Sequence, residues 1–391
     1  MHSIKAGRRP AGILATAPES GTSQSGAMFS EPRTRERALT VAVVGATGVV
    51  GRTMIQVLSE RNVPVGELRL LASGRSAGST VSAAGRTLTV GEATPDAFEG
   101  VDIALFSAGS DVSLQLAPEA AIRGATVIDN SNAWRMEANV PLIVSQVNPQ
   151  DAEWHEGIIA NPNCSTMQLA PVLMAIRDKA GIERVIVDTY QSVSGTGADA
   201  LAELETQVRA HVAGEMKVAS VYPHPIAFNA LPEIDVFLEN GYTREEWKVV
   251  SECRKILHLP DLRVSCTAVR VPVFVSHSEA VHVETTRSLS PEEARKIFAA
   301  VPGVVVQDDP ATHLYPLATQ AAGKDEIFVG RIRKDPSVDR GLAFWVVSDN
   351  LRKGAATNAV EIAEMLVERG WVSARSRRAA PSTAIGVGEA S

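Results

Sequence analysis

A short apolar strand followed at once by a glycine-rich turn lies near the start of the patterned part of the sequence. Residues 39–44 (LTVAVV) are mostly β-branched and lack polar alternation, which is typical of a strand buried on both faces. Gly45, Gly48 and Gly51 follow, and residues 50–58 then repeat apolar side chains at helical spacing. This order predicts a dinucleotide-binding unit, with a pyrophosphate at the helix N-terminus. The spacing G-x-x-G-x-x-G differs from the standard G-x-G-x-x-G. The prediction therefore depends on the strand and the helix that flank the turn.

Further strands alternate with helices as far as residue 129. We predict strands over residues 68–72, 101–106 and 125–129. A helix between the last two has apolar residues at Leu114, Leu116, Ala117 and Ala121. This alternation predicts an α/β domain of Rossmann type, with a doubly wound parallel sheet.

The end of the second strand bears on the choice of cofactor. In NAD-binding proteins an acidic residue about 20 positions after the glycines binds the ribose 2′-hydroxyl. Here Arg75 and Ser76 instead offer a cation and a hydroxyl suited to a 2′-phosphate. We therefore favour NADP over NAD; the alternative is a solvated basic turn without a ligand.

The second half of the chain contains many strands and few helices. Strands are predicted over residues 185–193, 264–275, 279–285, 327–332 and 342–347, with one helix over 291–300. This pattern favours an α+β domain with a large mixed sheet. A final helix over residues 355–369, ended by Gly370, is expected to pack back on the nucleotide-binding domain.

These elements divide the chain into two domains. We expect the NADP-binding domain to comprise residues 38–163 and 349–372, and the second domain residues 164–348. Residues 1–37 and 373–391 lack periodicity, and we expect a disordered extension and a disordered tail. Met28 is an alternative start, and a mitochondrial presequence is a weaker interpretation of the basic, Ser-rich extension.

Composition excludes several classes of protein. A net charge of −7, without long runs of like charge, does not favour a nucleic-acid or anionic-membrane partner. No stretch approaches the roughly 18 consecutive apolar residues of a membrane span. Cys164, Cys253 and Cys266 form no C-x-x-C pair, which argues against disulfides and zinc and fits a reducing cytoplasm. Since H-E-x-x-H is also absent, we predict no metal site.

Cys164 lies in the segment Asn161-Pro162-Asn163-Cys164-Ser165-Thr166, between an apolar strand and a helical pattern. Pro162 ends the strand, and Asn163 or Ser165 is the expected helix cap. At a helix N-terminus, free N–H groups and the helix dipole favour the thiolate, which is the nucleophile. The alternative is a buried cysteine that packs as a small hydrophobic residue.

A nucleophilic cysteine beside a nicotinamide site suggests aldehyde oxidation through a thioester, or its reverse. His277 is the best candidate for proton transfer, although a polar residue at a strand end is the simpler interpretation. Arg270, among valines, is costly to bury unless it binds an anion such as a substrate carboxylate. On one unbroken strand the two residues would face opposite sides, so Pro272 or the corner at 276–278 must break the alternation.

Five segments together resemble the aspartate-semialdehyde dehydrogenase family over residues 39–371. They are Gly45-Ala46-Thr47-Gly48-Val49-Val50-Gly51, Asn132-Ala133-Trp134-Arg135, residues 161–166, Gln191 with Ser194-Gly195-Thr196-Gly197, and Arg270 with His277. The resemblance implies NADP-dependent reductive dephosphorylation of L-4-aspartyl phosphate to L-aspartate 4-semialdehyde, on the route to lysine, methionine and threonine. It also implies that residues 164–348 are a catalytic and dimerisation domain, forming a homodimer that sometimes pairs into a tetramer.

The resemblance also implies roles for individual residues. Cys164 would be the acyl-thioester nucleophile, His277 the acid/base, and Gln191 the residue that orients the thiohemiacetal or substrate. Substrate-binding residues would be Arg270 for the carboxylate and Glu245 for the amino group, with Arg135 and Lys248 for phosphate. The expected NADP contacts are Gly45, Thr47, Gly48, Val49, Val50, Arg75, Ser76, Ser194, Gly195 and Asn350. Without the resemblance, Glu245 and Lys248 would be interpreted as an exposed i, i+3 pair on a helix.

Three alternatives follow from the same features. An N-acetyl-γ-glutamyl-phosphate reductase shares the thioester chemistry but differs around the cysteine and the histidine. A short-chain dehydrogenase requires Tyr-x-x-x-Lys, and none of the four tyrosines has a lysine four positions later. A catalytically inactive NADP-binding relative would be expected to lack Cys164.

Overall fold

A computed structural model describes residues 38–83, 85–216 and 218–372. The extension expected at 1–37 and the tail expected at 373–391 lie outside the described residues. Within these residues no helix is both long and apolar enough to cross a bilayer.

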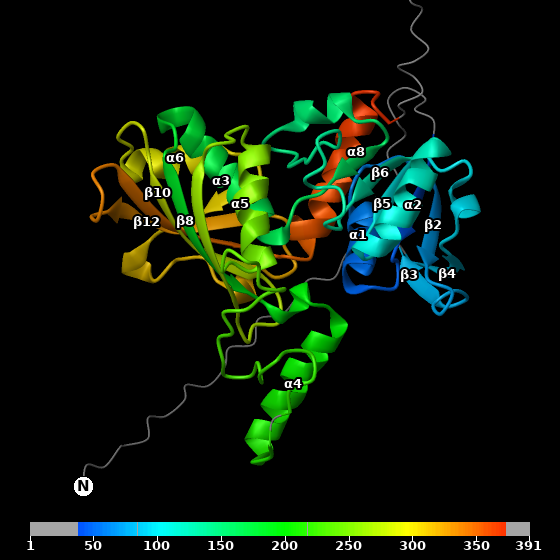
Figure 1. Ribbon diagram of the computed structural model, residues 1–391, viewed down its shortest axis with the longest axis horizontal. Helices are drawn as coiled ribbons and strands as arrows, with labels where there is room; N and C mark the ends of the chain where they lie inside the picture. Colours follow the sequence, from blue (N-terminus) through cyan, green and yellow to red (C-terminus); the bar gives the residue numbers. More distant parts are fainter. Residues whose placement is uncertain (1–37, 84, 217, 373–391) are drawn as a thin grey trace, which may run out of the picture. The chain divides into compact units, whose positions relative to one another are not determined.

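The N-terminal part of the described chain forms a seven-stranded sheet in the order β3-β4-β2-β1-β5-β6-β7 (Figure 1). Its strands are β1 (Leu39–Val44), β2 (Val65–Ala72), β3 (Thr80–Ala83), β4 (Arg86–Glu92), β5 (Ile103–Phe106), β6 (Thr126–Asp129) and β7 (Ile158–Ala160). All neighbours are parallel except the edge pair β3–β4. The predicted doubly wound sheet is confirmed. The pair β3–β4 was not predicted, because most of its residues are exposed and polar.

Helices cover both faces of this sheet. On one face, α1 (Val49–Glu60) and α8 (Asn358–Glu368) bury Met54, Val57, Ile362 and Leu366 against β1, β5 and β6. In Figure 1, α8 lies with the N-terminal strands although it comes from the other end of the chain. The expected packing of the last helix is therefore confirmed.

On the other face, α2 (Ser110–Ile122) and the 3-10 turn η1 (Pro95–Phe98) pack against the sheet. The inward residues of α2 are Ser113, Leu116, Ala117 and Ala120. The expected apolar face was wrong at Leu114, which is 52% exposed. Its position in the helix turns it away from the face on which Leu116 and Ala120 lie.

The glycine turn between β1 and α1 is shaped by close backbone approaches. Gly45 has φ +82°, a left-handed conformation that favours glycine. A Cβ on Gly51 would lie 2.2 Å from the carbonyl oxygen of Gly45. The first turn of α1 therefore rests directly on the turn, with its N-terminus at the carboxyl end of β1.

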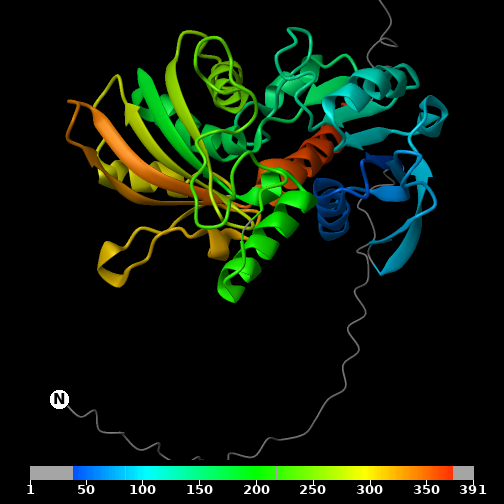
Figure 2. The same cartoon turned by 60° about the horizontal axis from the view of Figure 1, so that its bottom comes forward.

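The second half of the chain forms a six-stranded sheet in the order β11-β12-β13-β10-β8-β9, drawn from green to orange in Figure 2. Its strands are β8 (Arg184–Gln191), β9 (Arg263–Arg270), β10 (His277–Glu284), β11 (Val304–Val306), β12 (Ile327–Asp335) and β13 (Gly341–Ser348). β8 and β9 are parallel, as are β11 and β12, while the other pairs are antiparallel. The predicted mixed sheet is confirmed.

One face of the second sheet is covered by α3 (Cys164–Ala180), α5 (Arg244–Ile256) and α6 (Pro291–Ala299). Their apolar residues form a continuous core with Val187, Val281 and Phe344 of the strands. The other elements are η2 (Pro149–Trp154), η3 (Val193–Gly195), α4 (Ala198–Ala213), η4 (Pro310–Thr312), α7 (Ala318–Ala321) and η5 (Arg352–Thr357). In both views α4 extends away from the two sheets.

Several predicted boundaries differ from the structure by two residues or more, and two of the differences bear on the candidate site. The strand expected over 264–275 ends at Arg270, because Pro272 cannot donate to a ladder. The helix expected from residue 355 begins as a π-helical turn, η5, and becomes α-helical only at Asn358. π-Helical turns are rare in proteins, but those that occur are often found at functional sites. This turn lies against the N-terminus of α3, where Gly354 approaches Cys164.

Glu279 is a buried carboxyl group inside the second sheet. It is 0% exposed on β10, and neither carboxylate oxygen makes a well-aligned hydrogen bond within the described residues. Burial raises the pKa of Glu279 well above its ordinary value, and the nearby Gln168 amide offsets only part of this effect. The folded protein therefore holds a proton that the unfolded chain releases near pH 4.

We predict that Glu279→Gln abolishes a decrease in the free energy of unfolding that wild type shows as the pH rises. As the pH rises from the unfolded pKa of about 4.3 towards the folded pKa, wild type should lose up to about 1.4 kcal/mol per pH unit relative to the variant. Thermal and urea unfolding from pH 4 to pH 8 measures the difference. Exposed Glu239→Gln is the control for loss of a carboxyl group, and parallel profiles for wild type and Glu279→Gln would contradict the prediction.

Candidate active site

A cavity of about 380 Å³ opens where α3, α5, the ends of β8 and β9, and the η5 turn meet. Its lining includes many of the residues expected at the active site: Val50, Arg135, Cys164, Gln191, Gly195, Glu245, Lys248, Arg270 and Asn350. Other expected residues are not part of this lining: Gly45, Thr47, Gly48, Val49, Arg75, Ser76, Ser194 and His277. The cavity thus brings together the substrate-binding and phosphate-binding candidates with Cys164 and Gln191, whereas His277 and most of the cofactor candidates are not part of its lining.

Cys164 is the first residue of α3, directly after the short strand β7 and Pro162. Asn163 is the helix cap: its Oδ1 accepts from the N–H groups of Ser165 at 2.9 Å and Thr166 at 3.4 Å. One of the two predicted caps is therefore confirmed. A Cβ on Gly354 of η5 would lie 3.0 Å from the Cβ of Cys164, so the η5 backbone packs directly on Cys164.

The resting thiol is less acidic than the sequence suggested. Burial raises the pKa of Cys164 to about 12, and the negative charge of Glu245 adds to the shift, against the opposing charges of Arg270, Arg135 and Lys248. The expected effect of the helix N-terminus on Cys164 is therefore opposed by burial and by Glu245. Glu245 comes from α5, some 80 residues away in the sequence.

Arg270 and His277 reach the same region because the chain changes direction between them. Arg270 ends β9 and His277 begins β10, and Ser276 has φ +81°, which is uncommon for a residue other than glycine. A Cβ on Gly195 would lie 3.2 Å from Nη1 of Arg270 and 3.4 Å from Nε2 of His277. The predicted break in strand alternation is confirmed, and Gly195 leaves room for both side chains.

The guanidinium of Arg270 is buried and lacks an ionic partner within the described residues. It is 5% exposed, and Nη1 donates to the backbone oxygen of Ser192 at 2.7 Å. Its Nε has no hydrogen-bond partner among the described residues. Burying such a cation without an anion is costly, so this guanidinium is available to an anionic ligand in the cavity.

His277 is held in one orientation by Ser192. The backbone N–H of Ser192 donates to Nδ1 at 3.0 Å, so the neutral ring carries its proton on Nε2. Nε2 is buried and has no partner within the described residues. Burial and the charge of Arg270 lower the pKa of His277 to about 3, so the ring is neutral at physiological pH.

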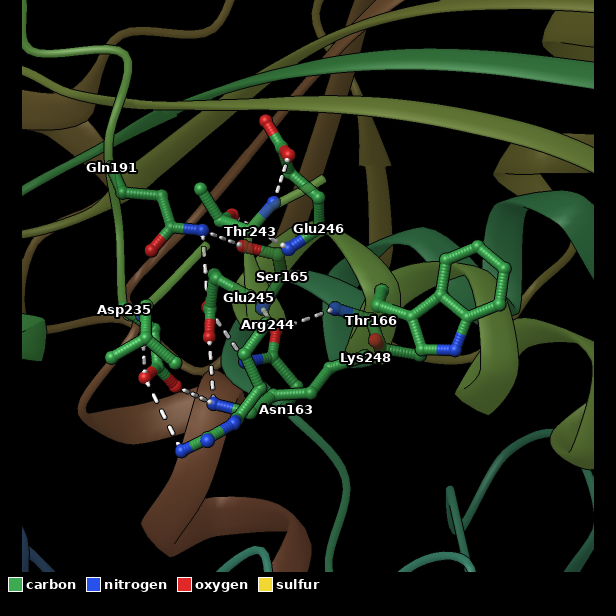
Figure 3. Close-up of polar contacts among 12 residues, drawn as sticks. Asn163, Ser165, Thr166, Gln191, Asp235, Thr243, Arg244, Glu245, Glu246 and Lys248 are labelled. Atoms are coloured by element: carbon green, nitrogen blue, oxygen red, sulfur yellow. Dashed lines mark hydrogen bonds and ion pairs between the residues drawn. The ribbon is translucent and has the colours of Figure 1, made fainter. Parts of the chain in front are cut away.

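Glu245 and Lys248 are not the exposed pair that helix periodicity alone suggested. Glu245 is 6% exposed, and its Oε1 accepts from Nδ2 of Asn163 at 2.7 Å and from Nε2 of Gln191 at 3.2 Å. Its Oε2 lies 3.1 Å from Nζ of Lys248 (Figure 3). Burial alone would raise the pKa of Glu245, but Lys248, Asn163 and Arg270 together lower it to about 2.

Gln191 is held by Ser165 and Glu245, and Arg135 by Glu252, which the sequence did not single out. Nε2 of Gln191 donates to Oγ of Ser165 at 2.9 Å (Figure 3). Nη1 of Arg135 lies 3.0 Å from Oε1 of Glu252, and Nη2 donates to the backbone oxygen of Asn130 at 2.9 Å. Glu252 is 1% exposed and also accepts from the N–H of Asn163 at 2.7 Å. Glu252 lies seven residues after Glu245, so a search for acids on one face of α5 could have found it.

Asp235 is a second residue that the sequence did not indicate. Its Oδ2 lies 2.9 Å from Nζ of Lys248, on the loop that precedes α5. No periodicity marks this loop, so the sequence held no signal for it.

The cofactor candidates lie in two groups. Gly45, Thr47, Gly48, Val49 and Val50 form the turn and the start of α1, where Gly48 provides no side-chain cap and leaves the first N–H groups of the helix available. These groups suit a pyrophosphate.

Arg75 and Ser76 lie on the turn after β2, where Arg75 is exposed. A Cβ on the neighbouring Gly74 would lie 2.8 Å from Oε1 of Glu92, an acid that the sequence did not place near this turn.

Ser194 and Asn350 form a buried polar group beside His277. Oδ1 of Asn350 accepts from Oγ of Ser192 at 3.0 Å, from Oγ of Ser194 at 3.0 Å and from the N–H of Ser276 at 2.9 Å. The hydroxyl of Ser194 is therefore turned towards Asn350. This group supports both the Ser276 corner and the Ser192 amide that orients His277.

Comparison with known proteins agrees with this geometry. Residues 40–155 match the family model described as semialdehyde dehydrogenase, NAD binding domain, and residues 173–353 match that described as semialdehyde dehydrogenase, dimerisation domain. The chain is 55% identical over 336 residues to the aspartate-semialdehyde dehydrogenase of Aquifex aeolicus, covering 85% of this chain and 99% of that protein. It is 52% identical over 338 residues to the enzyme of that name from Bacillus subtilis, covering 84% and 98%.

Comparison with solved structures points to the same family. Aspartate semialdehyde dehydrogenase II from Vibrio cholerae, complexed with ASA, superposes with a TM-score of 0.83 at 45% sequence identity, covering 85% of this chain and 99% of that one. The family models and these identities together leave no other assignment for the two domains. The chain therefore belongs to the aspartate-semialdehyde dehydrogenase family.

Proposed function

We propose that the protein is an NADP-dependent aspartate-semialdehyde dehydrogenase that interconverts L-4-aspartyl phosphate and L-aspartate 4-semialdehyde. The observation that carries this proposal is the charge pattern around Cys164: the buried guanidinium of Arg270 and the buried carboxylate of Glu245 line the same cavity. A small zwitterion with one carboxylate and one ammonium group matches both. High identity to relatives of this name supports the proposal.

Arg270 would bind the substrate carboxylate and Glu245 its ammonium group. The same pairing argues against N-acetyl-γ-glutamyl phosphate as substrate. That molecule carries an amide in place of the ammonium, so it would form no ionic contact with the Glu245 carboxylate, whose pKa is held at about 2. The charge pattern thus favours the free amino acid.

We assign the chemistry to Cys164, His277 and Gln191. In the oxidative direction Sγ would add to the aldehyde carbon and the thiol proton would pass to the carbonyl oxygen, which gives a thiohemiacetal. The Nε2–H of His277, whose Nδ1 accepts from Ser192, would donate a hydrogen bond to this oxygen during the transfer. After oxidation the acyl group is a thioester on Sγ, and the attack of phosphate releases it. Gln191, held by Ser165 and Glu245, would fix the position of the substrate.

Phosphate would bind between Arg135 and Lys248, both of which line the cavity. Each cation already has a carboxylate partner, Glu252 for Arg135 and Glu245 for Lys248. Two cations from different parts of the chain give a dianion two ionic contacts beside Cys164.

NADP would lie on the α1 N-terminus, because Gly45 and Gly51 permit close approach and Gly48 leaves the first N–H groups uncapped. When bound, NADP supplies the hydride acceptor or donor. Arg75 and Ser76 would bind the 2′-phosphate, and Gly195 and Asn350 line the cavity on the side of Cys164. We further propose the domain boundaries given above, a homodimer through residues 164–348 that can pair into a tetramer, and a cytoplasmic role in lysine, methionine and threonine synthesis.

The decisive assay follows NADPH formation from NADP⁺ and L-aspartate 4-semialdehyde, with and without inorganic phosphate. Phosphate-dependent turnover is the expected result, because phosphorolysis of the thioester requires it. Cys164→Ala should lower kcat by at least about a thousandfold while NADPH binding, followed by fluorescence, persists. An active Cys164→Ala protein would exclude the thioester route. Turnover with N-acetylglutamate 5-semialdehyde alone would exclude L-aspartate 4-semialdehyde as the substrate.

Alkylation of Cys164 by iodoacetamide tests its protonation state. With a pKa of about 12, the thiolate fraction and the alkylation rate should rise about tenfold per pH unit from pH 7 to 10 without a plateau. Glu245→Gln removes a negative charge beside the sulfur, so alkylation at a given pH should be faster. Mass spectrometry locates the label, and Cys164→Ala corrects for other sites. A rate that levels off near neutral pH would contradict the assignment.

Cofactor preference depends on the turn after β2. Arg75→Ala should raise the KM for NADP by about tenfold, the size expected for a lost charged hydrogen bond, and change that for NAD little. Glu92→Gln should act in the opposite direction, because its carboxylate lies beside Gly74 and would repel a 2′-phosphate. Steady-state kinetics with both cofactors measures the two effects. An equal change for NADP and NAD in Arg75→Ala would remove this residue from the 2′-phosphate site.

A further inference from the structure

Lys248 is bound by two carboxylates at once. Its Nζ lies 2.9 Å from Oδ2 of Asp235 and 3.1 Å from Oε2 of Glu245. Figure 3 shows the ammonium group between them. A phosphate dianion that approaches Lys248 therefore meets a cation that is already neutralised. One carboxylate must leave before phosphate gains a favourable ionic contact.

Glu245 is the fixed partner of the two. Asn163 and Gln191 both donate to its Oε1, and its side chain is 8% exposed. Releasing Glu245 would break these hydrogen bonds and leave a buried charge unpaired.

Asp235 is held far less firmly. Its side chain is 27% exposed, and its other oxygen accepts only from the N–H of Val236 next to it and lies 3.6 Å from Nη1 of Arg244. It also has φ +68°, a conformation that Asp and Asn tolerate better than most residues. The backbone around it is anchored: Leu231 pairs with Arg270, and the N–H of Arg244 donates to the oxygen of Val236. A rotation of the Asp235 side chain is therefore enough to release Lys248.

Arg244 offers Asp235 a second cation on the solvent side. Its side chain is 52% exposed at the first position of α5. Figure 3 shows Asp235 facing Lys248 and Arg244 together. The carboxylate thus exchanges one cation for another when it turns away from Lys248, and does not lose its ionic partner.

We propose that Asp235 is a displaceable counter-ion that occupies Lys248 in the resting enzyme, gives way to inorganic phosphate, and thereby sets the affinity for phosphate. Asp235 is a positioning residue, since it acts through Lys248. The inference rests on the proposed role of Lys248 in phosphate binding. Asp235 would therefore influence the KM for phosphate without changing the KM for the aldehyde.

Asp235→Asn is the direct test. The amide keeps the shape of the side chain and tolerates the same φ, but it no longer competes as an anion. The KM for phosphate should fall at least about fivefold, and the KM for L-aspartate 4-semialdehyde should change by less than about twofold. Calorimetric titration of the enzyme with inorganic phosphate should show the same gain without turnover. Glu239→Gln, which removes an exposed acid from the same loop, should leave both values unchanged.

Arg244→Gln provides a second test of opposite sign. Without its alternative partner Asp235 should hold Lys248 more firmly, so the KM for phosphate should rise about twofold to fivefold. In the double variant with Asp235→Asn this rise should vanish, because no carboxylate remains to be transferred. An equal rise in both backgrounds would mean that Arg244 binds phosphate itself, and would overturn the exchange.

The outcomes separate this inference from the proposed function. If wild type shows no phosphate-dependent turnover and no phosphate binding, the proposed function fails first. If wild type depends on phosphate but Asp235→Asn leaves its KM and its calorimetric affinity unchanged, only the role of Asp235 is overturned. A fall in both the phosphate and the aldehyde KM by the same factor would also overturn it, because the effect would then be a general change in charge.

Discussion

The site depends on the hydrogen bonds of Asn163. Its Oδ1 caps α3, its Nδ2 donates to Glu245, and its backbone N–H donates to Glu252. Asn163 therefore caps the helix that begins at Cys164 and joins it to Glu245 and Glu252 of α5. Through them it also positions Lys248 and Arg135, since each of these cations is paired with one of the two acids. The positions of Cys164 and of the charged groups around it therefore depend on the same residue, Asn163.

Burial and nearby charges together keep Cys164 and His277 uncharged. Burial and the negative charge of Glu245 oppose ionisation of Cys164, and burial and the positive charge of Arg270 oppose protonation of His277. The two charges come from the residues proposed to bind the ammonium group and the carboxylate of the substrate. In the proposed complex, the substrate ammonium group would neutralise Glu245, which raises the pKa of Cys164, and the substrate carboxylate would neutralise Arg270, which lowers it. Neutralisation of Arg270 would also make His277 easier to protonate, because the charge of Arg270 lowers the pKa of the ring.

The sequence predicted correctly those elements whose formation depends on neighbouring residues. The strand 39–44 with its glycine turn, the Asn163 cap and the break between Arg270 and His277 all follow from residue type and spacing. The pair β3–β4 was missed because its residues are polar and exposed, and the apolar face of α2 was misplaced at Leu114. The burial of Cys164 and its proximity to Glu245, which raise the pKa of the thiol, could not be predicted, because both result from tertiary packing. Glu252 was within reach of a search for acids at helical spacing, whereas nothing in the loop sequence distinguishes Asp235 from other exposed acids.

A site for charged substrates has to limit its own charge when it is empty. Lys248 and Arg135 each have an internal carboxylate, whereas Arg270 is stabilised by a backbone oxygen and has no acid within ion-pair distance among the described residues. This difference fits the order in which ligands would be needed. In the proposed mechanism, a guanidinium without an acid would attract the substrate carboxylate directly, while cations with counter-ions would bind phosphate only by exchange. Such exchange would lower the affinity for a small anion that could otherwise occupy the site before the thioester forms.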